Sequence, residues 1–130
     1  DHGDKYVVET TPFGTTASTI TSLMQYSAGG GGDYPEAVDE ALEAAANLQW
    51  SEGNVARIVL LVADAPPHDE KLQAAFDLAM RLGQLGVKVH GLAASGVKYK
   101  AEYEMRLMGV VTGARYMWLT DDSEIGNPHV

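Results

Sequence analysis

The stretch that decides the fold is Arg-Ile-Val-Leu-Leu-Val-Ala-Asp-Ala-Pro-Pro-His-Asp-Glu, residues 57–70. Residues 57–63 lack polar alternation after the arginine, which is typical of a parallel strand that helices cover on both faces. The strand delivers Asp64 to a proline-containing loop. Ligands of open α/β sheets collect at the carboxyl ends of the strands, so Asp64 is predicted to lie at the functional edge.

Helix and strand patterns alternate on both sides of this stretch. Upstream, the pattern predicts a short strand over residues 5–10 and helices over 15–27 and 33–49. Downstream, it predicts helices over residues 70–85 and 100–111 and strands over 87–93 and 115–119. This order predicts one domain over residues 1–130, an α/β fold with a doubly wound, mainly parallel sheet and helices on both faces.

Composition narrows the classes of partner. The chain has 130 residues, no cysteine and a net charge of −9. Such an acidic chain is a poor partner for a nucleic-acid backbone or an anionic membrane surface. No apolar run reaches membrane-spanning length, so no membrane insertion is expected. Without cysteine there is no disulfide framework, which fits a cytoplasmic protein but also a secreted bacterial one, so the compartment stays open.

Two aspartates are candidate metal ligands. The glycine-rich residues 29–32 deliver Asp33 to a predicted helix start, and Asp64 follows the buried strand. Carboxylates that converge at a sheet edge suit a hard cation, Mg²⁺ or alternatively Mn²⁺ or Ca²⁺. His68, in the loop after Asp64, is a candidate for contacting the ligand or orienting a metal-bound water. Asp33 is equally well explained as a helix N-cap, and His68 is better explained as a surface loop residue.

Three blocks of sequence resemble one known family. They are Gly-Gly-Gly-Asp-Tyr-Pro-Glu-Ala (residues 30–37), Val-Ala-Asp-Ala-Pro-Pro-His (62–68) and Leu-Thr-Asp-Asp-Ser-Glu-Ile-Gly-Asn (119–127). In this order and spacing they resemble a branch of the von Willebrand factor type A (vWA) domains. The resemblance implies a metal-ion-dependent adhesion site at the carboxyl edge of the sheet. It implies that Asp33 takes the middle-loop position of that site and Asp64 the last one.

The sequence departs from the family pattern at its start. It has no Asp-x-Ser-x-Ser segment, and residues 1–4 resemble the turn between the second and third strands of the family. The resemblance therefore implies an N-terminally truncated domain that lacks its first strands, with metal affinity that is weak or absent. The sheet would keep apolar edges facing a gap, which predicts a homo-oligomer or completion by another chain.

These features predict a binding protein rather than an enzyme. The expected function is adhesion-type protein–protein interaction, in which a divalent cation binds carboxylates of the partner protein. One alternative is a structural or assembly fragment whose open sheet edges pair with another chain. A less favoured alternative is a Mg²⁺-dependent hydrolase of the phosphoesterase type, for which the sequence supplies no activating lysine and no phosphate clamp.

Overall fold

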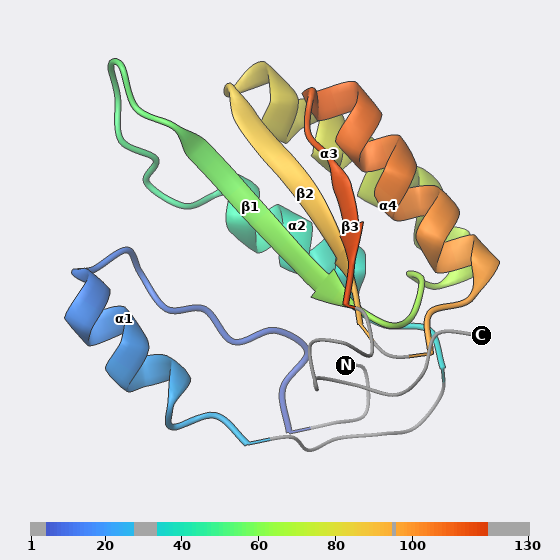
Figure 1. Ribbon diagram of the computed structural model, residues 1–130, viewed down its shortest axis with the longest axis horizontal. Helices are drawn as coiled ribbons and strands as arrows, with labels where there is room; N and C mark the ends of the chain where they lie inside the picture. Colours follow the sequence, from blue (N-terminus) through green and yellow to red (C-terminus); the bar gives the residue numbers. More distant parts are fainter. Residues whose placement is uncertain (1–4, 28–33, 95, 120–130) are drawn as a thin grey trace.

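A computed structural model describes residues 5–27, 34–94 and 96–119 of the chain. Figure 1 labels the elements along the chain. They are α1 (Thr16–Leu23), α2 (Val38–Ala46), β1 (Arg57–Ala63), the short 3-10 helix η1 (Asp69–Lys71), α3 (Leu72–Gln84), β2 (Val87–Ala93), α4 (Tyr99–Thr112) and β3 (Tyr116–Trp118).

The strands form one parallel sheet in the order β1-β2-β3. Val59 of β1 lies opposite Val89 of β2, and Gly91 of β2 lies opposite Tyr116 of β3. Helix α3 connects β1 to β2, and α4 connects β2 to β3. The α/β class and the parallel sheet are thus confirmed, and the predicted bounds of β1 and β2 match the structure residue for residue.

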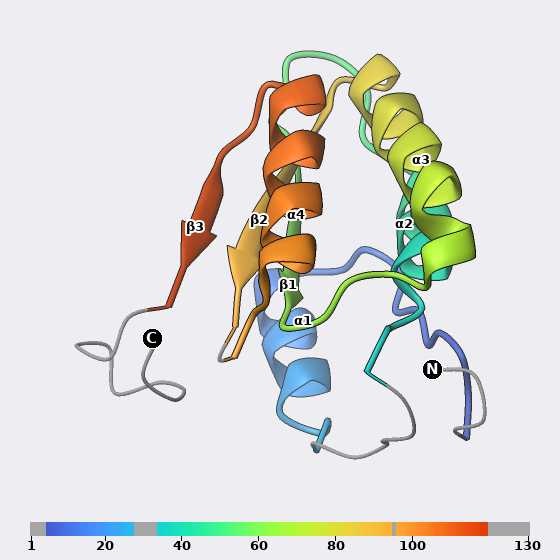
Figure 2. The ribbon, with the colours of Figure 1, turned by 90° about the vertical axis from the view of Figure 1, so that its right-hand side faces the viewer.

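The core lies between one face of this sheet and the helices α2, α3 and α4. In Figure 2 the three helices stand on the same side of β2 and β3. Two crossovers that step in the same direction across a sheet place their helices on the same face. The buried apolar residues of this core are Val38, Leu42, Ala46, Ala75, Ala79, Leu82, Val87, Val89 and Met108.

No described helix covers the opposite face of the sheet, and Figure 1 shows the sheet obliquely from that side, with α2 and α3 behind it. Ile58, Leu60 and Val62 point to this side and are 56%, 53% and 55% exposed. We call this surface the bare face; its apolar residues are Ile58, Leu60, Val62, Leu92 and Met117, and the outward Lys88 and His90 of β2 lie on it opposite Ile58 and Leu60. The prediction that residues 57–63 are buried on both sides is therefore wrong. The doubly wound arrangement with helices on both faces is not observed in the part of the chain that the structure describes.

The N-terminal elements also differ from their predictions. Residues 5–10 form no strand. Helix α1 is shorter than the predicted 15–27, and none of its side chains is buried; its apolar residues Ile20 and Leu23 are exposed. Helix α2 begins at Val38 rather than at residue 33. The reason for this late start is a parallel bridge between Glu36 and Pro67, which holds the preceding backbone outside the helix.

Helix α4 buries a different side from the one its sequence indicates. The large apolar residues Tyr103 and Val110, which share one side of the predicted helix over 100–111, are 55% and 76% exposed, whereas Ala101, Met105 and Met108 are buried. A close contact with the sheet sets this rotation. A Cβ placed on Gly91 of β2 would lie 2.6 Å from the Cβ of Met105, so only glycine permits the observed approach of α4 to β2.

We expect Gly91→Ala to lower the free energy of unfolding by about 1–3 kcal/mol, because the added methyl group would force α4 away from β2. Urea denaturation followed by circular dichroism measures this change. Lys88→Ala, on the opposite side of the same strand, is the matched control and should shift stability by no more than about 0.5 kcal/mol. Equal stability of wild type and Gly91→Ala would contradict the close packing.

Candidate functional site at the carboxyl edge of the sheet

Three loops meet where β1 and β2 end. The backbone N–H of Glu36, before α2, donates to the carbonyl oxygen of Pro66 at 2.9 Å. The hydroxyl of Tyr34 donates to the carbonyl oxygen of Asp64 at 3.2 Å. The ammonium of Lys98, after β2, lies 4.3 Å from the centroid of the Tyr34 ring, within cation–π range. These contacts tie residues 34–37 and 64–67 and the start of α4 into one edge.

Asp64 lies at the carboxyl end of β1, as predicted, and is exposed. Its backbone carbonyl accepts the Tyr34 hydroxyl. Its carboxylate forms no hydrogen bond or ion pair with any residue that the structure describes. An exposed carboxylate in this position is available to a cation or to a partner, but its role as a metal ligand stays a prediction.

The predicted roles of the other two site residues, Asp33 and His68, are not tested by the structure. Asp33 lies outside the described residues, so its convergence with Asp64 is untested. His68 is partly buried and immediately precedes η1, where its carbonyl oxygen accepts the backbone N–H of Lys71 at 2.8 Å. Over residues 5–27, 34–94 and 96–119, no group of three or more metal-binding side chains comes together.

A groove of about 340 Å³ adjoins Asp64 at the end of β1, and its lining includes both the inward Leu61 and the outward Val62. Its walls are mostly apolar, and its two acidic residues are Glu36 and Asp64. The residues lining it are Val7, Val8, Glu36, Ala37, Val38, Ala41, Leu61, Val62, Ala63 and Asp64. The groove thus combines an apolar lining with a negatively charged rim next to the predicted site.

An ion pair fixes the helices beneath the edge. The ammonium of Lys71 lies 3.1 Å from Oδ2 of Asp39 and 3.6 Å from Oε1 of Glu40. Burial raises the pKa of Asp39 above its ordinary value, and the neighbouring Lys71 partly opposes that rise. The same carboxylate raises the pKa of Lys71. This pair joins α2 to the start of α3, and so holds the Asp64 loop between them.

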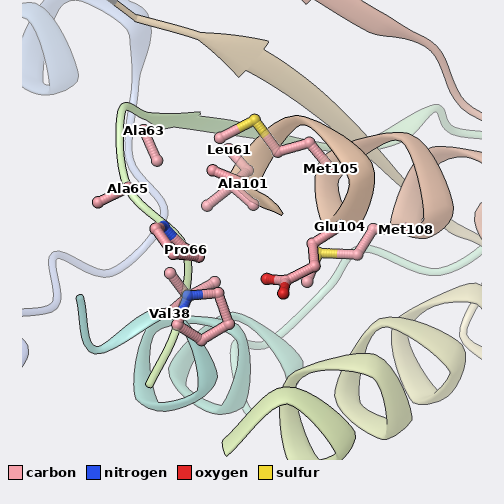
Figure 3. A pocket seen from close by; sticks show the side chains of 10 residues that line it. Val38, Leu61, Ala63, Ala65, Pro66, Ala101, Glu104, Met105 and Met108 are labelled. Carbon is pink, nitrogen blue, oxygen red and sulfur yellow. The ribbon is translucent and has the colours of Figure 1, made fainter. Parts of the chain in front are cut away.

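Glu104 is the acidic residue at this edge that sequence reasoning missed. Figure 3 shows its carboxyl group directed from α4 toward a small apolar cavity bounded by Val38, Pro66 and Pro67. Its Oε2 is buried and has no hydrogen-bond partner among the described residues. Burial raises the pKa of Glu104 to about 7, the nearby Lys100 opposes the rise, and Asp69 adds to it.

A signal for Glu104 was present in the sequence. It lies three residues after Ala101 and four before Met108, and both of these are buried. Residues at this spacing share one side of a helix. The large apolar residues Tyr103 and Val110 suggest that a different side of the helix faces the core. If that side faced the core, Glu104 would be exposed to solvent.

Comparison with known proteins identifies no relative of this chain. No family model matches the chain, and no curated protein or solved structure is similar enough to count as a match. The likeness to vWA domains therefore remains a prediction from the three sequence blocks. Among the described residues, no helix is long and apolar enough to cross a membrane.

We expect the stability of Glu104→Gln relative to wild type to increase between pH 5 and pH 8. Because the pKa of Glu104 is about 7 in the folded protein and 4.5 ordinarily, wild-type stability falls as pH rises through this window, whereas glutamine does not titrate. The carboxyl is partly solvated, so the expected gain at pH 8 is limited to about 1 kcal/mol.

Urea denaturation at the two pH values measures this difference. Glu102→Gln on the same helix is the matched control, because Glu102 is ion-paired with Arg106 and does not line the apolar cavity. A Glu104→Gln variant whose stability tracks wild type at both pH values would contradict the raised pKa.

Proposed function

We propose that this chain is a non-enzymatic protein-interaction module that binds a partner protein over the bare face of its sheet. The observation that carries the proposal is the exposure of Ile58, Leu60 and Val62, each more than half accessible on one side of a parallel strand. Leu92 and Met117 continue the same face across β2 and β3.

The physical argument is that parallel sheets are stable when both of their faces are covered. Apolar side chains that remain in contact with water forgo about 25 cal/mol of stabilisation for every Å² that a partner would bury. Contiguous exposed apolar patches mark interaction sites in soluble proteins. In addition, β1 is an edge strand whose outer side pairs with no described strand. The backbone N–H and C=O groups on that side could therefore form hydrogen bonds with a strand of the partner.

We further propose that the doubly wound arrangement is completed by docking. A second copy of the chain is the first partner to test, because the two copies would each bring an apolar face of the same kind. A different chain that supplies a covering layer is the alternative within the same proposal. In either case the partner contributes apolar surface, not a substrate.

We expect Leu60→Lys to convert the assembled protein into a monomer, because a charge at the centre of the bare face would be buried without a counter-ion. Light scattering at several protein concentrations measures the mass. Val110→Lys is the matched control, since Val110 is 76% exposed on α4 and away from the sheet. A wild type that is monomeric at every concentration would rule out self-assembly, and retention of the assembly by Leu60→Lys would rule out the bare face.

A metal-dependent mode is a second candidate function, favoured by the exposed carboxylate of Asp64 at the carboxyl edge, which has no partner among the described residues. In this proposal Asp33 and Asp64 hold Mg²⁺, or alternatively Mn²⁺ or Ca²⁺, and the cation keeps open positions for a carboxylate of the partner protein. The cation supplies the attraction that an acidic surface alone would oppose. Such binding is adhesion-like and needs neither nucleophile nor general base.

We expect Asp64→Ala to abolish the heat of Mg²⁺ binding in calorimetric titrations of the protein. Asp77→Ala is the matched control, because Asp77 lies on α3, where its carboxylate accepts a hydrogen bond from the side chain of Gln73. Equal heats in wild type and Asp64→Ala would remove Asp64 from a metal site. Chelation by EDTA separates the two modes, because it should dissolve a metal-bridged complex and leave a sheet-face assembly intact.

A further inference from the structure

A second groove lies on the helix side of the molecule, between α3 and α4. It encloses about 290 Å³ and is separate from the bare face, which is on the other side of the sheet. The residues lining it are Leu72, Gln73, Phe76, Tyr103, Glu104, Leu107 and Met108. Small-molecule sites in proteins have this character, being mainly apolar with a few polar groups, and this groove is near their lower size limit.

Glu104 connects the groove with the protein interior. It lines both the α3–α4 groove and the small cavity of Figure 3. Its buried Oε2 has no hydrogen-bond partner among the described residues. The Glu104 side chain therefore forms part of the groove wall, whereas its carboxyl group is directed toward the small cavity, where Oε2 is buried.

Among the described residues, the cations nearest to this carboxyl are paired with other acidic groups. Lys100, one turn earlier on α4, is paired with Asp69 at the start of η1. Arg106 is paired with Glu102 and lies over the ring of Tyr116. The residues that α3 contributes to the groove are Leu72, Gln73 and Phe76, none of them charged. The charged groups that influence Glu104 are thus Lys100 and Asp69, which act in opposite directions.

A carboxylate in apolar surroundings is unfavourable unless it is paired and hydrogen-bonded. A ligand that carries a positive charge on an apolar body would satisfy both features of the groove, the acceptor and the apolar walls. The aromatic rings of Phe76 and Tyr103 in the lining also favour a cation. An anionic ligand would be repelled by Glu104.

From this geometry we propose that the α3–α4 groove binds a small organic ammonium, with its apolar body among Leu72, Phe76 and Leu107 and its charged group on Glu104. The volume suits a single ring or a short alkyl chain. This binding site is independent of the protein-interaction function proposed above, since it uses neither the bare face nor Asp64.

The test compares 2-phenylethylammonium with 2-phenylethanol, which has the same body and no charge. Solution NMR titrations of the isotopically labelled full chain give the dissociation constants and the shifted residues. At pH 8 we expect the ammonium to bind roughly tenfold more tightly or better, from one charge-assisted hydrogen bond. At pH 5.5 the preference should disappear, because Glu104, with a pKa of about 7, is then protonated while the amine keeps its charge.

Three variants make the result specific. Glu104→Gln should remove the preference for the ammonium at pH 8, whereas the control Glu102→Gln should preserve it. Leu107→Trp should block both ligands by filling the groove without changing Glu104. Equal binding of the two ligands at pH 8, an unchanged preference in Glu104→Gln, or no shifted residues in the groove would each overturn the proposal.

Discussion

The structure depends on one constraint: both crossovers step in the same direction across the parallel sheet. Helices α3 and α4 therefore lie on one face, and α2 joins them there by packing against α3. The close approach of α4 to β2 at Gly91 makes this layer tight, with Met105 against the strand. The same constraint leaves Ile58, Leu60 and Val62 without a covering helix among the described residues. A well-packed face and a bare face are two consequences of one topology.

The constraint also gives two carboxylates at the same sheet edge opposite environments. Asp64 follows β1 into solvent, where its side chain has no partner among the described residues. Glu104 projects from α4 into the packed layer, where burial raises its pKa to about 7. The difference in burial, rather than the residue type, thus determines which kind of ligand each carboxyl group can bind. The solvated group suits a hard cation or a polar partner, and the enclosed group suits an organic cation or a proton.

The proposed protein-binding, metal-binding and ligand-binding functions are compatible with one another because each uses a different surface of this small protein. The bare face is mainly apolar and suits a protein partner, the Asp64 edge is acidic, and the α3–α4 groove lies in the helix layer. The net charge of −9 favours cations at the edge and the groove alike. That charge also opposes self-association at low ionic strength, so apolar contact over the bare face has to supply the attraction between two copies.

The sequence by itself determined the class of fold, the two long strands and the position of Asp64 after β1. Those features follow from local patterns, namely the unbroken apolar run of residues 58–63, the valine-containing segment 87–93 and helical periodicity. Only the tertiary structure decided the start of α2, which a bridge between Glu36 and Pro67 delays, and the inward side of α4, which Gly91 sets. The enclosure of Glu104, for which the sequence held only the helical spacing from Ala101 and Met108, and the exposure of Ile58, Leu60 and Val62 were likewise decided by the tertiary structure. Burial depends on which elements pack together, and an apolar strand has the same sequence whether or not a second layer covers it.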